Sequence, residues 1–317
     1  MLIPPLLIAV NFLGFSYAHL AQRVHAAQNP FGATVQARPP ILALYLAYSG
    51  HIWHGDWGIM PTVAAEPIGR LLLHVGGISL GLLAITFVLS TCCGLLLGVA
   101  GIHHHPPRVA RWFTPLTTIG LATPSFYLGT VVIALLLFYF VRSGPDADLI
   151  LPLQGFGWDR HLLLPTLALV VRPTAQLAQA TATLLVTELE LLYITAARGR
   201  GMNRRRIAWR HALRVAWAPL VMTIAASLRL LTGELLLVEK LFGWPGLGRL
   251  LASALVPPTT ATLGRLDGAA SYFLYPPLVA GALTAFALLF LLVDLVAVLL
   301  AHRLDPRLLS VTAVDHG

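Results

Sequence analysis

Long uninterrupted blocks of apolar residues constrain this chain more than any other feature of its sequence. A bilayer core about 30 Å thick needs roughly 20 apolar residues for one helix to cross it, and several windows reach that length. Because hydrocarbon offers no water to backbone polar groups, only helices and closed barrels can span it. Barrel strands would alternate over about ten residues, whereas these blocks are longer and do not alternate. The sequence therefore predicts an all-α integral membrane protein.

The composition agrees with this prediction and argues against a nucleic-acid-binding protein. Hydrophobic residues make up 57% of the chain and charged residues 11%, against about 25% charged residues in soluble domains. The net charge of +8 comes from arginines gathered in loops between the apolar blocks, a pattern that orients membrane proteins. Cys92 and Cys93 are adjacent within an apolar block, a spacing that fits neither a disulfide nor a metal site. We therefore expect no metal site in this chain.

Six segments are predicted to span the membrane. They cover residues 2–20, 76–101, 115–141, 162–186, 217–238 and 276–301. A shorter apolar stretch, 41–50, has aromatic and histidine neighbours, which favour a helix at the membrane interface. Arginines are densest between the fourth and fifth spans, so the positive-inside rule places both termini in the cytoplasm. The chain divides into a first helix with an external segment, a five-helix core and a tail, at residues 1–70, 71–310 and 311–317.

The loop 188–216 does not have the short, polar character of an ordinary connector. Apolar residues recur in it at helical spacing, namely Leu189, Leu192, Tyr193, Ala196 and Ala197. Gly199 and Gly201 can end that helix, and Asn203 can begin a second, arginine-rich one. An apolar stripe with small alanines suits the close approach of another protein. The alternative is a basic helix that binds anionic lipid headgroups.

Charged residues inside the predicted spans are candidates for function, because they are costly in a membrane. They are Arg172, Arg229, Glu234 and Asp294. Arg229 and Glu234 are five residues apart, which does not favour a pair on one helix face; they could line a path or bind across a subunit interface. Snorkelling or local pairing is the alternative, above all for Arg172 and Asp294. Pro124 is expected to kink the third span and to free backbone carbonyls that can line a polar path.

Five motifs, in order along the chain, resemble one known family. The segment YITAARGRGMNRRRIAWRHALRVAWAP at 193–219 resembles the EAA loop of binding-protein-dependent ABC permeases, closest to the dipeptide, oligopeptide and nickel branch. The other matches are GDWG at 55–58, LATPSF at 121–126, VEKLFGWPGLGRLL at 238–251 and LDPR at 304–307. The chain departs from the family in lacking a basic pair before the first span and in having Gln176 and Gln179 where arginines are usual.

The resemblance implies the type I ABC importer permease fold, with six transmembrane helices and a cytoplasmic coupling helix. Such a subunit forms the translocation path for peptides or similar small solutes and couples it to a separate ATPase. The sequence has no Gly-x-x-x-x-Gly-Lys phosphate loop, so the chain is not expected to be an enzyme, and ATP and Mg are expected on partner subunits. The implied partners are a second homologous permease, cytoplasmic ATPase subunits and an external solute-binding protein. The implied location is the inner membrane of a bacterial or archaeal cell.

The resemblance, the apolar stripe and the intramembrane charges together nominate functional residues. Coupling to the ATPase is assigned to Leu189, Leu192, Tyr193, Ala196, Ala197, Arg198, Gly201 and His211. The translocation path or its external gate is assigned to Pro124, Ser125, Arg229, Glu234, Glu239, Phe242, Pro245 and Gly246. Gly246 and Gly248 are expected to form a tight turn at the membrane face. Phe242 and Trp244 are expected either as anchors at the membrane interface or in ordinary packing.

Two alternatives to a peptide permease remain from the sequence. Nickel or another small solute is the alternative within the same branch. A secondary transporter driven by an ion gradient is the alternative from another class; it would favour acids or histidines deep in the spans and an internal repeat. The sequence shows no such repeat.

Overall fold

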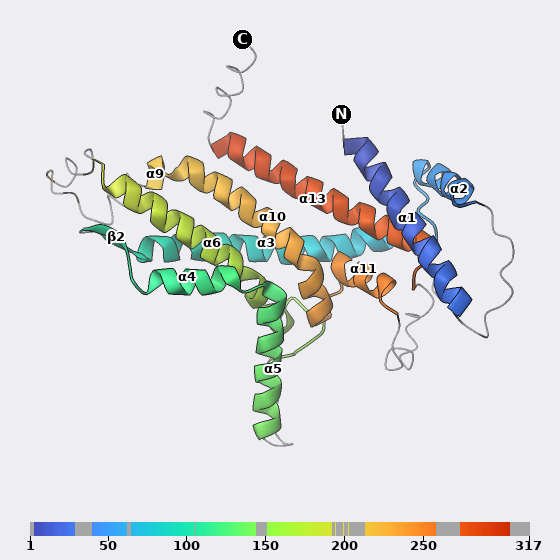
Figure 1. Cartoon of the computed structure of the whole chain (residues 1–317), viewed down its shortest axis with the longest axis horizontal. Coiled ribbons are helices and arrows are strands. Elements are labelled where there is room, and N and C mark those ends of the chain that lie inside the picture. The colour runs from blue at the N-terminus through green and yellow to red at the C-terminus, as the bar shows by residue number, and fades with distance from the viewer. Residues whose placement is uncertain are drawn as a thin grey trace, which may run out of the picture. The chain divides into compact units, whose positions relative to one another are not determined.

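The structure of this chain is a computed structural model, and it is almost entirely helical (Figure 1). It describes residues 3–28, 40–61, 65–104, 106–143, 151–191, 194, 199, 202, 213–257 and 273–304. Five of the described helices are long and apolar enough to cross a membrane. They are α1 (Ile3–Gln28), α3 (Ile68–Ala100), α5 (Ser125–Ser143), α10 (Trp217–Phe242) and α13 (Pro276–Leu304). The all-α membrane class is therefore confirmed.

The fourth predicted span corresponds to α6 (Leu163–Leu189), which differs in character from these five helices. Its 27 residues span about 40 Å at 1.5 Å per residue, enough to cross a bilayer. Threonines and glutamines make it more polar than the other long helices. Polar side chains in a membrane helix face other helices or water rather than lipid, and α6 is the helix that others surround.

The third predicted span is two helices and not a single kinked one. α4 (Phe113–Ala122) ends at Thr123, whose backbone is extended, with φ −91° and ψ 113°. The residue before a proline is pushed out of the helical region, and Pro124 follows here. α5 begins at the next residue and leaves in a new direction (Figure 1). The sequence predicted a bend at Pro124, but the steric restriction on Thr123 interrupts the helix completely.

The chain forms two compact units. One comprises residues 1–81 and 243–290, and the other comprises residues 82–242 and 291–317. Helices α3 and α13 contribute residues to both units. The division into 1–70, 71–310 and 311–317 concerns the course of the chain through the membrane and stays a prediction.

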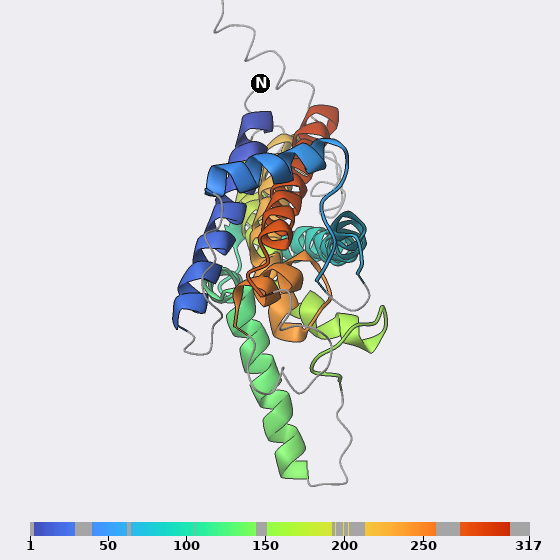
Figure 2. The same cartoon turned by 90° about the vertical axis from the view of Figure 1, so that its right-hand side faces the viewer.

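Aromatic rings hold α1 and α2 (Ile41–Trp53) together in the first unit. α2 crosses α1 and contacts it (Figure 2), and it confirms the short helix expected at 41–50. The ring of Phe15 stacks on that of Tyr48 with centroids 5.0 Å apart, and Phe12 meets Tyr45 edge-on at 4.9 Å. Burial raises the pKa of Tyr48 to about 12. Its hydroxyl therefore stays protonated at neutral pH and donates to the carbonyl of Pro277, 3.2 Å away.

The predicted GDWG motif forms a tight turn in the same unit. Gly55 and Gly58 have φ values of +82° and +89°, which favour glycine because they lie in the left-handed region. The Asp56 carboxylate accepts a hydrogen bond from the Gly58 N–H at 2.9 Å. The Trp57 ring lies against Gly69 of α3, where an added Cβ would come within 3.2 Å of it. The motif thus folds the chain sharply and packs its tryptophan on a glycine of α3.

Helix α6 is the centre of the second unit, where it packs against α4, α5 and α10. Small residues allow close helix contacts within this unit, as is usual between membrane helices. A Cβ added at Gly98 of α3 would lie 2.5 Å from Thr181 Cβ and 2.8 Å from the Ala178 carbonyl oxygen. At Gly120 of α4 it would lie 2.8 Å from Ala175 Cβ. The backbones of α3 and α4 therefore approach α6 as closely as glycine permits.

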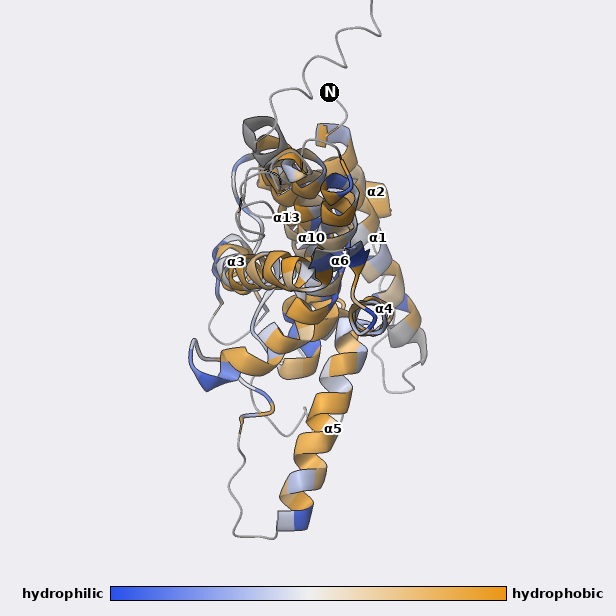
Figure 3. Ribbon diagram, turned by 90° about the vertical axis from the view of Figure 1, so that its left-hand side faces the viewer, coloured by the Kyte–Doolittle hydropathy of each residue, from blue (hydrophilic) through white to orange (hydrophobic). Residues whose placement is uncertain are grey.

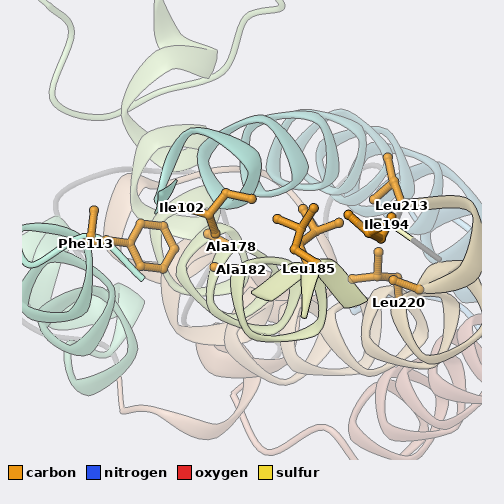
Figure 4. Packing of buried hydrophobic residues seen from close by; sticks show 11 residues of the cluster. Ile102, Phe113, Ala178, Ala182, Leu185, Ile194, Leu213 and Leu220 are labelled. Atoms are coloured by element: carbon orange, nitrogen blue, oxygen red, sulfur yellow. The ribbon is translucent and has the colours of Figure 1, made fainter. Parts of the chain in front are cut away.

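A small hairpin and a hydrophobic cluster close one end of this unit. β1 (Ile102–His104) pairs antiparallel with β2 (Pro107–Val109). The hairpin packs against α6. Buried side chains from the hairpin region, α6 and the start of α10 form one cluster, called here the Leu185 cluster (Figure 4). Its members are Ile102, Ala110, Phe113, Ala178, Ala182, Leu185, Leu189, Ile194, Leu213, Ala216 and Leu220.

Candidate functional site

Three helices of the second unit bring polar side chains together at the break between α4 and α5. The Glu234 carboxylate on α10 accepts a hydrogen bond from the hydroxyl of Ser125, the first residue of α5. It also forms an ion pair with the guanidinium of Arg172 on α6. Ser125 is buried. These three residues, called here the Glu234 cluster, tie α5, α6 and α10 to one carboxylate.

The Glu234 cluster sits where a carboxylate is favoured electrostatically. The α5 helix begins at Ser125, and the partial positive charge of a helix N-terminus stabilises an anion beside it. The Arg172 charge adds a direct partner, so the pair is neutral overall. A neutral pair costs less in a low-dielectric region than either charge alone. The side chains of Arg172 and Glu234 are 36% and 15% exposed, so the cluster is open on one side.

A second ion pair joins α10 to α13 within the same unit. Arg229 Nε donates to an Asp294 carboxylate oxygen, and the two side chains are 47% and 51% exposed. The four intramembrane charges therefore form two pairs between helices. This local pairing is the alternative that the sequence left open for Arg172 and Asp294. The spacing argument against a pair between Arg229 and Glu234 agrees, since each has its partner on another helix.

The break at Pro124 also exposes the end of α4. Proline has no backbone N–H, so the carbonyl of Gly120, four residues earlier, lacks its helical donor. Gly120 lies against Ala175 on α6, which is the neighbour of Gln176 in sequence. The freed carbonyl that the sequence predicted thus lies in the last turn of α4, the helix that packs against α6.

The C-terminal end of α10 is tightly packed. Glu239 and Phe242 are 0% and 2% exposed, and Gly129 of α5 lies directly against the Phe242 ring. Trp244 is also fully buried. Burial of Phe242 and Trp244 agrees with ordinary packing, one of the two alternatives that the sequence left open.

The turn after α10 also differs in detail from the prediction. Gly243 has a φ of +65° and ends α10, as glycine often does after a helix. Gly246 is the extended residue that precedes α11 (Leu247–Leu255). Gly248 lies inside α11, so the turn is made by residues 243–246. The Leu247 N–H donates to the Ser79 hydroxyl at 2.9 Å, which fixes the start of α11 on α3. Pro245 lies in this turn.

Residues 154 and 155, in the loop that precedes η1 (Arg160–Leu162), bind the C-terminus of α10 through hydrogen bonds. The Gln154 side chain donates to the Leu241 carbonyl at 3.1 Å, and the Gly155 N–H donates to the Phe242 carbonyl at 3.0 Å. These bonds satisfy two of the carbonyls that a helix end leaves free. The short helix η1 ends the loop. Its capping residue Asp159 accepts from His161, and these hydrogen bonds lower the pKa of the Asp159 carboxyl.

The predicted coupling residues lie mostly outside the described part of the chain. This applies to Leu192, Tyr193, Ala196, Ala197, Arg198, Gly201 and His211. Leu189 is described, and it is the last residue of α6, 1% exposed and packed in the Leu185 cluster (Figure 4). Its side chain therefore packs within this chain. The coupling role of the other residues stays a prediction.

The sequence identified Glu234 and Arg172 as intramembrane charges and Ser125 within the LATPSF motif, but it did not join the three residues. Glu234 and Arg172 are 62 residues apart, and Ser125 and Glu234 are 109 apart. Spacing along one helix reports only on neighbours three or four residues away. The signal that could have found the pair is the opposite sign of two isolated intramembrane charges on different helices, which tend to pair with one another.

The sequence is similar to a characterised family of membrane proteins. The family described as "Binding-protein-dependent transport system inner membrane component" matches residues 90–310. The oligopeptide transport system permease protein OppB of Mycobacterium tuberculosis H37Rv is 30% identical over 223 residues, covering 66% of this chain and 67% of the relative. The dipeptide transport system permease protein DppB of Escherichia coli K12 is 26% identical over 342 aligned positions, covering 97% of this chain and 96% of the relative.

The matched region covers more than half of the chain and contains the whole Glu234 cluster. It also includes α4, α5, α6 and α10, the helices that surround that cluster. Membership of this family sets aside the secondary transporter driven by an ion gradient. The chain belongs to the family of binding-protein-dependent transport system inner membrane components, the multi-pass permease subunits of ABC importers.

Proposed function

We propose that this chain forms the translocation path for peptides in an ABC importer. The observation that carries the proposal is similarity over nearly the whole chain, 97% of its length, to a protein named as a dipeptide transport system permease. A relative named as an oligopeptide permease supports the same solute class. The polar cluster around Glu234 gives this permease a charged, partly open site between its helices.

Residues 188–216 are proposed to receive the movement of a separate ATPase. Leu189 stands at the start of this segment and Leu213 near its end, and both pack in the Leu185 cluster, with Ile194 between them in sequence. The segment is therefore fixed to the core at both ends. A contact made by its intervening residues would act on α6 and α10 together. Such a contact suits a two-state element that nucleotide biases.

The remaining partners follow from what the chain itself does not contain. Its sequence has one lysine, Lys240, and no phosphate-binding loop, so ATP and Mg are proposed to bind to partner ATPase subunits. A second homologous permease and an external solute-binding protein complete the assembly. Both termini are proposed to be cytoplasmic, because this places the arginine-rich loop before α10 inside the cell.

Transport in a reconstituted assembly tests the solute class. The chain is placed in proteoliposomes with a homologous permease, ATPase subunits and a solute-binding protein from the same organism, and uptake of labelled dialanine is measured. Uptake that requires ATP hydrolysis is expected. A non-hydrolysable ATP analogue serves as the control. Uptake of nickel without any uptake of dipeptides would contradict the peptide proposal in favour of the alternative solute.

Co-purification tests the coupling segment. Gly201→Trp is expected to release the ATPase while the subunit still inserts into the membrane, because a bulky side chain would prevent close approach. The matched control is Gly50→Trp on α2, where an added side chain meets open space. Retention of the ATPase by Gly201→Trp would show that the coupling contact lies elsewhere.

A further inference from the structure

The Glu234 cluster has hydrogen-bonding capacity that the described residues leave unused. Arg172 Nε and Gln176 Oε1 are both shielded, and neither has a hydrogen-bond partner in the described part of the chain. Arg172 and Gln176 are four residues apart on α6, so their side chains leave the same face of that helix. Unpaired polar atoms in a shielded site are unfavourable, and such groups are rare unless a ligand or water uses them.

The open side of the cluster cannot face lipid. Arg172 is 36% exposed and Glu234 15% exposed, and both lie inside helices of the membrane region. Charged side chains at such depth face the interior of a bundle or a water-filled cavity. Most of α5, by contrast, presents an apolar surface (Figure 3), which suits lipid or another apolar helix. The charged side of the unit therefore faces the interior of the assembly or a water-filled cavity.

The cluster offers both kinds of group that a free peptide requires. Arg172 is a cation with a fork of donors that matches a carboxylate. Glu234 is an anion with the Ser125 hydroxyl bonded to it. Gln176 offers an amide side chain, which matches a peptide bond. The cluster thus combines a cation, an anion and neutral hydrogen-bonding groups.

We propose that Arg172, Glu234, Ser125 and Gln176 form a transient binding site for a zwitterionic solute, one with a free ammonium and a free carboxylate. The solute carboxylate pairs with Arg172 and its ammonium pairs with Glu234, so one internal ion pair is exchanged for two pairs with the solute. The proposal rests on the proposed function, because it names the chemical class of peptide that the path accepts.

Charge balance explains why the site would prefer a peptide with a free amine and a free carboxyl over a peptide with either group blocked. The empty site is neutral, and the site filled by a zwitterion is neutral again. A solute with a blocked amine would take Arg172 from Glu234 and leave that carboxylate unpaired. An uncompensated charge in a low-dielectric site is strongly disfavoured. A blocked carboxyl would leave Arg172 unpaired in the same way.

Selectivity in the complete reconstituted importer tests the proposal. Uptake of dialanine is compared with uptake of its N-acetyl form and of its C-terminal amide. Arg172→Gln is expected to reduce the preference for dialanine over the amide about tenfold and to keep the preference over the N-acetyl form. Glu234→Gln is expected to do the reverse. The external receptor is the same in every reaction, so its own selectivity cancels when variant and unchanged protein are compared.

Two further variants keep the test decisive. Gln176→Leu leaves the ion pair intact and is expected to slow uptake of all three compounds several-fold, even if the charge variants fail to assemble. Thr130→Val on α5 is the control, because that hydroxyl bonds only to its own helix at Phe126, and uptake should not change.

The possible results separate this proposal from the proposed function. Equal loss for dialanine and both blocked forms in the charge variants, or unchanged uptake in Gln176→Leu, would overturn the zwitterion site and leave peptide transport standing. Absence of ATP-dependent dipeptide uptake by the unchanged importer would overturn the solute class itself. The site would be supported if Arg172→Gln lowers only the preference for dialanine over the amide. Glu234→Gln should then lower only the preference for dialanine over the N-acetyl form.

Discussion

The α1–α2–α13 contacts of one unit and the α3–α6 contacts of the other hold helices together by opposite means. In the first, rings of Phe15 and Tyr48 fill the space between helices, and their centroids are 5.0 Å apart. In the second, Gly98 removes the side chain altogether, and an added Cβ would lie 2.8 Å from the Ala178 carbonyl oxygen. One contact is made by side chains and the other by backbone.

The difference determines what each contact can tolerate. Ring contacts can adjust by changes of side-chain rotamer, and hydrogen bonds from Asn11 and Tyr48 add to them. A glycine packed on another helix cannot adjust, because the neighbour to be displaced is backbone. Membrane helices lack a hydrophobic drive toward one another and depend on close packing. The α3–α6 contact should therefore be the more sensitive of the two.

Gly98→Leu is expected to have the largest effect. The added side chain would overlap Thr181 and the Ala178 carbonyl oxygen, and we expect a loss above about 4 kcal/mol, an unusually large effect for one substitution. The measurement is recovery of monodisperse subunit in detergent, with thermal unfolding of whatever is recovered. Gly77→Leu on the same helix is the control, because an added Cβ there meets nothing within 4 Å. Similar yields for the two variants would contradict the comparison.

Phe15→Ala is expected to cause the next largest loss of stability. The side chain is 6% exposed, and its removal leaves a cavity between Tyr45 and Tyr48 that costs about 3 kcal/mol. Thermal unfolding of the purified subunit measures this loss, and folded protein should still be recovered. Phe138→Ala on α5, where the ring is 64% exposed, should change the stability of the subunit little. A Phe15→Ala variant that cannot be recovered would show that the ring contacts do not adjust.

The hydrogen bond between Asn11 and Thr284 is expected to contribute less to the stability of the subunit than the Phe15 ring does. Asn11 Nδ2 donates to Thr284 Oγ1 at 2.8 Å between α1 and α13. Hydrogen bonds between membrane helices contribute about 0.6 kcal/mol on average, and the Asn11 Oδ1 atom has no partner among the described residues. A double-mutant cycle with Asn11→Leu and Thr284→Val should give a coupling near that value. A coupling energy above about 2 kcal/mol would exceed the range for such bonds.

Tyr48→Phe is expected to have the smallest effect. It removes the donor to the Pro277 carbonyl but keeps the ring stacked on Phe15. The expected loss is about 0.5 kcal/mol, at the low end for one neutral hydrogen bond. Tyr17→Phe, at an exposed position on α1, is the control and should leave the stability of the subunit unchanged. A loss as large as that of Phe15→Ala would mean that the hydroxyl, and not the ring, holds α2 in place.

Sequence reasoning predicted the features that depend on local composition. Long apolar blocks predicted the membrane helices, and the apolar stretch 41–50 with its aromatic neighbours predicted α2. The proline at 124 was recognised as a special position because it restricts backbone geometry locally, whereas the glycines at 55 and 58 were noticed only as part of the GDWG motif. These features need no knowledge of distant parts of the chain.

Features that depend on distant contacts were missed or only partly predicted. The pairing of Arg172 with Glu234 joins residues 62 positions apart, beyond the reach of helical periodicity. Burial of Trp244 depends on what surrounds it, and its aromatic character alone could not decide between the membrane interface and ordinary packing. The extent of the break at Pro124 depends on Thr123 and on the separate packing of α4 against α6. Each of these is decided by tertiary contacts.

The Leu185 cluster also has mechanical consequences for the chain between α6 and α10. A flexible segment that is attached at one end only can transmit a pulling force but not a pushing force. Residues 190–212 connect Leu189 to Leu213, and the side chains of Leu189 and Leu213 pack in the same cluster. Packed interiors are stiff and transmit strain. The cluster thus holds both ends of the segment, and a force on the segment would act on α6 and α10 together.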